Sequence, residues 1–204
     1  MTHHAQIGLI ILAGGLSRRF GDGNKLCKSL AGQPLICHTI ESFLHADIAT
    51  AYVITGYQEQ QVKAALSTYP VNFLHNPDYQ SGMASAITTA VNTLTPSIHH
   101  LMIALGDMPF IEPHDIKGLI ETHLATPAPE QAITRAYFNA TPGHPVLWGS
   151  AYFKRLSALT GDEGARGLIK TLSTQITPYE MSSAACITDY DTIHDFESHL
   201  VIKC

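Results

Sequence analysis

The stretch LIILAGGLSRRFGDGNK, from Leu9 to Lys25, decides the fold of this chain. It begins inside an apolar run over residues 7–12 that lacks helical spacing, which is typical of a strand buried on both faces of a parallel sheet. Gly14 and Gly15 follow at once, and such glycines let several backbone N–H groups converge on one anion. We therefore predict a phosphate-binding loop at the carboxyl end of a buried strand.

Basic and hydroxyl side chains are concentrated in the same loop. Arg18, Arg19 and Lys25 supply three cations, and Ser17 supplies a hydroxyl. The spacing matches neither the G-x-x-x-x-G-K-[ST] of P-loop NTPases nor the G-x-G-x-x-G of dinucleotide-binding proteins, so we exclude both classes. From the residues alone, an exposed turn with basic side chains remains the alternative.

Length and composition favour a compact α/β enzyme. A chain of 204 residues can bury about 70% of its unfolded surface around a single core. The net charge of -5 and the absence of any Lys/Arg run argue against nucleic acid or an anionic membrane as a partner. No apolar run approaches the ~20 residues of a membrane span, and the start MTHHAQ lacks the pattern of an export signal. We therefore expect a cytoplasmic protein.

The cysteines and histidines do not predict a metal centre. Cys27, Cys37, Cys186 and Cys204 have no zinc-like spacing, and we interpret them as reduced thiols. The twelve histidines are mostly scattered, and we expect them on the surface or in the core. We expect the only tryptophan, Trp148, to pack in the core.

A lone carboxylate follows another expected strand. The apolar run over 98–105 leads directly into Gly106-Asp107-Met108-Pro109, at the same edge of the sheet as the first loop. A carboxylate is a hard ligand that suits Mg²⁺, which takes its other ligands from phosphates and water. A role for Asp107 as a helix cap or turn residue is the alternative reading.

The rest of the chain reads as alternating strands and helices. Asn76-Pro77 and Ser81-Gly82 mark a loop before a helix, with Ser85 near its first turn, where a helix cap is the simplest reading. We expect further helices over 34–44, 58–66, 112–124, 151–159 and 165–172, further strands over 49–54, 71–74, 132–138 and 146–148, and a loop over 139–145. The Pro-containing connector at 125–130 is too short to separate two domains. We predict a single three-layer α/β/α domain over residues 1–204, with a Rossmann-like, mostly parallel sheet.

The first loop, L-A-G-G-x-S-x-R-F-G followed by Lys25, resembles the signature loop of the nucleotidyltransferases that activate sugar phosphates, methylerythritol phosphate and molybdopterin. The later motifs N-P-x-x-x-x-G-M-A-S, G-D-M-P, G-H-P, G-D-E-G-A-R and D-x-D-T narrow the resemblance to the molybdenum cofactor cytidylyltransferases. The resemblance implies a fold of the nucleotide-diphospho-sugar transferase type. It also implies a nucleotide-binding part at about 1–110 and an acceptor-side part at about 111–204.

The resemblance also implies the roles of individual residues. Arg19 and Lys25 would stabilise charge on the phosphates, and Asp107 would bind Mg²⁺. Asp191, chosen over Asp189, would complete the metal site, although Asp191 is equally well explained as a helix cap. The residues expected to bind the nucleotide are Leu12, Ala13, Gly14, Gly15, Ser17, Gly82, Ser85 and Gly106, and those expected on the acceptor side are His144 and Arg166.

The implied reaction joins the nucleotidyl group of CTP to the phosphate of molybdopterin, with Mg²⁺ as cofactor and pyrophosphate as leaving group. A recipient molybdoenzyme is a possible further partner. The sequence L-A-G-G differs from the L-A-A-G of the cytidylyltransferases and matches the related guanylyltransferases, so GTP on molybdopterin stays open. A transferase acting on a sugar or lactyl phosphate is also compatible with the first loop, and so is a cofactor carrier without turnover. Every enzymatic reading requires Lys25 and Asp107 to face each other across a gap that fits a triphosphate.

Overall fold

A seven-stranded sheet forms the centre of the computed structural model, which describes residues 7–17, 23–46 and 48–188. The strand order is β5-β4-β1-β6-β8-β7-β9, and β8 alone runs antiparallel to its neighbours. The strands are β1 (Ile7–Ala13), β4 (Thr50–Thr55), β5 (Asn72–His75), β6 (His100–Leu105), β7 (Ile133–Phe138), β8 (Thr141–Gly149) and β9 (Ile176–Glu180). A separate small hairpin pairs β2 (Ser29–Leu30) with β3 (Gln33–Pro34).

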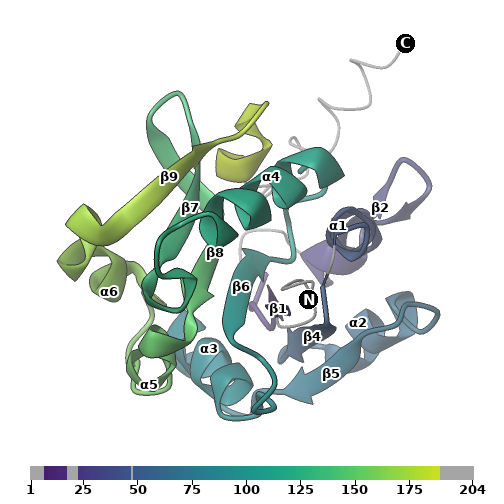
Figure 1. Ribbon diagram of the computed structural model, residues 1–204. Coiled ribbons are helices and arrows are strands. Elements are labelled where there is room, and N and C mark those ends of the chain that lie inside the picture. The colour runs from purple at the N-terminus through teal and green to yellow at the C-terminus, as the bar shows by residue number, and fades with distance from the viewer. Residues whose placement is uncertain (1–6, 18–22, 47, 189–204) are drawn as a thin grey trace.

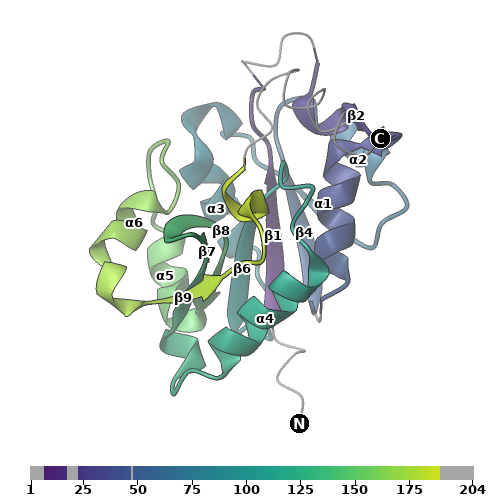
Figure 2. The same ribbon diagram turned by 90° about the horizontal axis from the view of Figure 1, so that it is seen from above.

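Helices cover both faces of this sheet (Figures 1 and 2). One face carries α1 (Leu35–Leu44), α2 (Glu59–Ala65) and α4 (Pro113–Leu124), and the other carries α3 (Met83–Val91), α5 (Phe153–Leu156) and α6 (Arg166–Thr171). Short 3₁₀ helices lie at η2 (Lys25–Cys27), η3 (Tyr79–Ser81), η4 (Pro129–Gln131), η5 (Ser150–Tyr152), η6 (Ser173–Gln175) and η7 (Ala184–Ile187). The predicted three-layer α/β/α architecture with a mostly parallel sheet is confirmed.

The central strand β1 is buried on both faces, as its apolar run predicts. Ile7, Leu9 and Ile11 pack in the core beneath α1, α2 and α4, whereas Ile10 packs in the core on the α3 side, and all four are 0% exposed. This alternation follows from the two-residue period of a strand. Because each such side chain contributes about 1.5–3 kcal/mol on burial, β1 anchors both cores at once.

The topology places two loops side by side at the carboxyl edge of the sheet. From β1 the chain moves outward to β4 and β5, then returns to the other side of β1 to form β6. Leu12 near the end of β1 is paired with Leu105 at the end of β6, so the loops that follow them are neighbours. Ligands of open α/β sheets bind in the crevice at this kind of switch point.

The structure corrects three expectations. The segment 139–145 is not all loop, because β8 already begins at Thr141 and pairs with Phe138 across a tight turn at Asn139 and Ala140. The helix expected over 151–159 is shorter, since only Phe153–Leu156 is α-helical. The parallel edge strand β9 and the β2–β3 hairpin were not predicted, and prolines in both weaken their strand pattern.

The structure also describes the tryptophan, which lies in the core as predicted, and three of the four cysteines. Cys27, Cys37 and Cys186 are free thiols, and Trp148 is a core residue that is 1% exposed. Cys204 lies outside the described residues. The described part of the chain contains no helix that is long and apolar enough to cross a bilayer.

Candidate active site

Lys25 and Asp107 meet at the carboxyl edge of the sheet. The Lys25 ammonium lies 2.6 Å from a carboxylate oxygen of Asp107, and the two side chains are 13% and 16% exposed. Lys25 opens η2, whose cap Asn24 accepts a hydrogen bond from the Leu26 amide and donates one to the Tyr57 carbonyl. The glycine and lysine loop therefore lies beside the acid at position 107, but the two side chains form a direct ion pair where a gap for a triphosphate was expected.

The loop after β1 is held tightly against the neighbouring strand. A Cβ atom on Gly14 would lie 3.2 Å from the amide nitrogen of Gly56, so the two backbones approach closely there. Ser17 has a φ of 49°, and its hydroxyl accepts a hydrogen bond from the Lys25 amide at 3.2 Å. A Cβ atom on Gly15 would meet nothing within 4 Å. The Ser17 hydroxyl thus helps to fix the start of η2.

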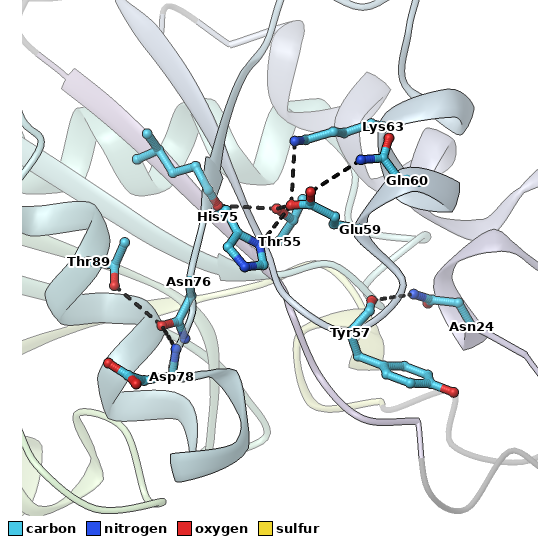
Figure 3. A network of polar contacts seen from close by, with 11 residues as sticks. Asn24, Thr55, Tyr57, Glu59, Gln60, Lys63, His75, Asn76, Asp78 and Thr89 are labelled. Carbon is cyan, nitrogen blue, oxygen red and sulfur yellow. Dashed lines mark hydrogen bonds and ion pairs between the residues drawn. The ribbon is translucent and has the colours of Figure 1, made fainter.

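A second loop, between β5 and α3, is organised by Asn76. This side chain is 1% exposed and accepts hydrogen bonds from the Asp78 amide and the Thr89 hydroxyl, as Figure 3 shows. Its amide nitrogen donates to the Ser85 hydroxyl at 2.8 Å, and Ser85 in turn contacts the Gly82 carbonyl at 2.8 Å. The Asn76 side chain is therefore held by the loop itself and by residues of α3.

Gly82 is the point where this loop contacts the segment before α6. Its φ is +114°, and a Cβ atom there would lie 2.3 Å from the Cα atom of Asp162. The Met83 amide donates to the Asp162 carbonyl at 3.4 Å. The glycine is required both by its backbone conformation and by this close approach.

A polar cluster around Glu59 joins the ends of β4 and β5 to α2 (Figure 3). The Glu59 carboxylate lies 3.2 Å from the Thr55 hydroxyl, 2.7 Å from His75 and 3.4 Å from Lys63. Burial pushes the pKa of Glu59 upward, but these three neighbours outweigh it and hold the pKa below its ordinary value. The cluster fixes the strand ends beside the Asn76 loop.

The two loops enclose a cavity of about 570 Å³, which we call the donor cavity. Lys25 and Asp107 line it together with five of the eight predicted nucleotide-binding residues: Leu12, Gly14, Gly15, Ser17 and Gly82. Asn76, Tyr79 and Asp162 also line it, although none of the three was predicted to bind the nucleotide. The structure thus gathers most of the expected nucleotide-binding residues around one hollow.

The other three predicted nucleotide-binding residues are not among those that line the donor cavity. Ala13 is 1% exposed and packs in the core. Gly106 donates its amide proton to the Leu12 carbonyl and accepts a hydrogen bond from Thr39. Ser85 holds the Asn76 loop. All three position the walls of the donor cavity.

A second cavity of about 360 Å³, here called the acceptor cavity, adjoins the first. Its walls include the two predicted acceptor-side residues His144 and Arg166, and also Arg135. Leu12, Met83 and Leu105 line both cavities and so form the partition between them.

His144 lies on β8 and not in a loop as expected. Burial, reinforced by the charge of Arg135, lowers the pKa of His144 to about 4, so its ring is neutral at pH 7. Its Nδ1 atom is buried and has no hydrogen-bond partner in the structure as described. A neutral imidazole in this wall can take part in hydrogen bonds but does not add a positive charge.

The donor set fits a magnesium ion that is held mainly by its substrate. Asp107 offers a carboxylate to the donor cavity, and the described residues contain no group of three or more potential metal ligands. Mg²⁺ is commonly bound by one or two carboxylates together with phosphates and water. The expected second ligand Asp191, its alternative Asp189 and the expected phosphate contact Arg19 lie outside the described residues.

Comparison with known families identifies one match over most of the chain. The profile of the MobA-like NTP transferase domain matches residues 9–176. The curated relative GlmU of Halorhodospira halophila, a bifunctional protein, is 31% identical over 57% of this chain, and the match spans 24% of GlmU. Nicotine blue oxidoreductase of Paenarthrobacter nicotinovorans is 24% identical over 90% of this chain and 91% of its own length.

Solved structures share the fold. The crystal structure of Rv0371c from Mycobacterium tuberculosis aligns with a TM-score of 0.84 at 22% identity, covering 96% of this chain and 97% of that one. A manganese complex of Rv0371c aligns with a TM-score of 0.79 at 20% identity, covering 96% and 98%.

Proposed function

Because this chain belongs to the MobA-like NTP transferase domain family, we propose that its cleft transfers the nucleotidyl group of CTP to the phosphate of molybdopterin. The observation that carries the proposal is the Lys25–Asp107 pair, 2.6 Å apart in the wall of the donor cavity. A cation and a carboxylate in a glycine-lined hollow are suited to a triphosphate and its magnesium. The reaction takes place in the cytoplasm, and the product passes to a molybdoenzyme.

In the proposed reaction, an ionised oxygen of the acceptor phosphate forms a new bond to the α-phosphorus of the nucleotide. The bond from that phosphorus to the bridging oxygen breaks, and pyrophosphate leaves. No strong general base is needed, since a phosphate monoester is already largely ionised at pH 7. Catalysis then depends on alignment and on neutralising charge.

The chain's own residues supply these effects. When the nucleotide enters, the Lys25 ammonium leaves Asp107 and pairs with the phosphates. Arg19 also neutralises charge on the phosphates. Backbone N–H groups of the loop at Gly14, Gly15 and Ser17 hold the phosphates. Asp107 and Asp191 would hold Mg²⁺, which supplies further neutralisation of phosphate charge.

The acceptor cavity suits a ring system attached to a phosphate. Met83 and Ile187, 38% and 37% exposed, both line it, and so does the buried Trp148. Such walls can pack against the faces of a pterin, and Arg135, His144 and Arg166 offer hydrogen-bond partners to its polar groups. A sugar phosphate is the alternative acceptor.

The choice of base is not explained by Gly14. A Cβ atom at this position would lie 3.2 Å from the Gly56 amide nitrogen, a contact that does not by itself exclude the alanine of the cytidylyltransferases. The motifs G-M-A-S, G-D-M-P, G-H-P and G-D-E-G-A-R favour CTP, and GTP is the alternative.

The test is to incubate the pure protein with Mg²⁺, molybdopterin and each of the four nucleoside triphosphates, and to measure pyrophosphate release. We expect release with CTP, and a loss of ~100-fold in kcat for Lys25→Ala and for Asp107→Ala. Lys28→Ala, which removes an exposed lysine from the same segment, is the control and should keep the wild-type rate. Pyrophosphate release with GTP alone would show that the substrate is GTP and not CTP. Tight binding of nucleotide and molybdopterin without pyrophosphate release would show that the protein is a carrier.

A further inference from the structure

Arg135 and Arg166 face the same acceptor cavity. Arg135 extends from β7 and is partly buried, whereas Arg166 opens α6 and is exposed. Among residues 7–17, 23–46 and 48–188, no Asp or Glu side chain lies within ion-pair distance of either guanidinium. Glu163 lines the cavity as well, but it is exposed and beyond that distance.

A guanidinium in this setting is unusual. Charged groups that are removed from water are normally paired, because desolvation is costly. Burial lowers the pKa of Arg135, and the nearby charge of Arg166 lowers it as well. Arginine nevertheless stays protonated in proteins, so two positive charges face this cavity while the neighbouring His144 is neutral. An anion in the cavity would relieve their repulsion.

The orientation of Arg135 is also fixed. Its Nε–H donates to the carbonyl of Gly143 at 3.0 Å, across the β7–β8 hairpin. The two terminal nitrogens have no protein partner in the described structure, so their N–H groups remain available to the cavity. A planar guanidinium held in this way can bind two phosphate oxygens at once.

We propose that Arg135, assisted by Arg166, binds the phosphate of the acceptor, and that the faces of the ring system attached to this phosphate pack on the apolar part of the cavity wall. This inference rests on the function proposed above. The walls supply the apolar part, because Met83, Ile87 and Trp148 line the same cavity. The bound phosphate is the nucleophile of the transfer, and the arginines hold it beside the partition of Leu12, Met83 and Leu105.

The test uses the full chain with Mg²⁺ and a non-hydrolysable CTP analogue that fills the donor cavity. Phenyl phosphate and inorganic phosphate are then titrated by calorimetry into wild type, Arg135→Met, Arg135→Lys and the control Arg155→Met. Arg155 is an exposed arginine of α5 that does not line either cavity as described.

We expect Arg135→Met to weaken phenyl phosphate binding by about 10- to 100-fold, the range of one charge-assisted hydrogen bond. Arg135→Lys should recover part of the loss, and Arg155→Met should match wild type. Phenyl phosphate should bind more tightly than inorganic phosphate, because the ring is buried on apolar walls. In turnover, Arg135→Met should raise the KM for the acceptor and leave the KM for the nucleotide unchanged.

Equal binding of phenyl phosphate by wild type and Arg135→Met would overturn this inference, and so would the absence of binding to wild type. Failure of the proposed function has a different signature, since the nucleotide analogue itself would then not bind. In that case the titration is repeated without nucleotide on Lys25→Ala. If Lys25→Ala loses phenyl phosphate binding and Arg135→Met keeps it, the phosphate binds in the donor cavity. That outcome would contradict the inference.

Discussion

Gly82 shows how a single residue connects the Asn76 loop to the segment before α6. Its Cβ position lies 2.3 Å from the Asp162 backbone, and its φ is +114°. We expect Gly82→Ala to lower the free energy of unfolding by about 2–5 kcal/mol, from backbone strain together with overpacking. It should also weaken nucleotide binding, because the displaced loop lines the donor cavity. Urea unfolding and calorimetry measure the two effects.

Gly167 provides the matched control. It lies in α6, and a Cβ atom there would meet nothing within 4 Å. Gly167→Ala should leave nucleotide binding unchanged and raise stability by up to ~1 kcal/mol through helix propensity. Equal stabilities for the two alanine variants would show that the contact between Gly82 and Asp162 is not as close as described.

At the scale of elements, Ser85 ties α3 to the loop that precedes it. Removing its hydroxyl leaves the Asn76 amide, 1% exposed, without the partner that accepts its proton at 2.8 Å. We expect Ser85→Ala to cost about 1–3 kcal/mol and to raise the KM for the nucleotide. Ser42→Ala, which removes only a hydroxyl bonded to a carbonyl within α1, is the control and should do neither. An unchanged KM for the nucleotide in Ser85→Ala would show that the Asn76 loop does not contribute to nucleotide binding.

The elements also show what the sequence can and cannot predict. The helix expected over 112–124 is found at Pro113–Leu124, and the strand expected over 7–12 is found at Ile7–Ala13, because their apolar periodicity is strong. The start of β8 was missed because its sequence, TPGHP, contains two prolines and a glycine, the usual signals of a loop. Its strand conformation comes from pairing with β7.

The sequence predicts those residues of the candidate site that belong to a motif directly after a strand. It does not predict residues that reach the site only through tertiary contacts. The meeting of Lys25 and Asp107, 82 residues apart, follows from two strands that end at one edge. Arg135 was missed because a charged residue in a strand carries no information about the cavity that it faces. The signal available was a lone charged residue within an otherwise uncharged strand, ITRAYF.

At the scale of the molecule, the buried His123 and the half-buried His144 make stability depend on pH. Burial, with the charge of His100, lowers the pKa of His123 to about 3, and the pKa of His144 falls to about 4. His123 is 0% exposed and hydrogen-bonds to Thr134 and His100. Both folded pKa values lie below the value of 6.5 expected on unfolding, so the unfolded chain binds more protons between these limits. Stability is therefore fully present above pH 6.5 and falls as the pH decreases.

The expected slope between about pH 6 and pH 4.5 is about 1.4 kcal/mol per pH unit for each histidine. Replacing His123 by Gln should reduce the free energy of unfolding at pH 7 and remove one of the two contributions to the slope. Urea unfolding at a series of pH values provides the measurement. An identical slope in the wild type and the variant would contradict the assignment to His123.

The partition of Leu12, Met83 and Leu105 has a consequence for how such a protein can diverge. Apart from these side chains, the residues found to line the donor cavity differ from those that line the acceptor cavity. Under the proposed function, substitutions in β7, β8 and α6 should therefore change the choice of acceptor and leave the lining of the donor cavity as it is.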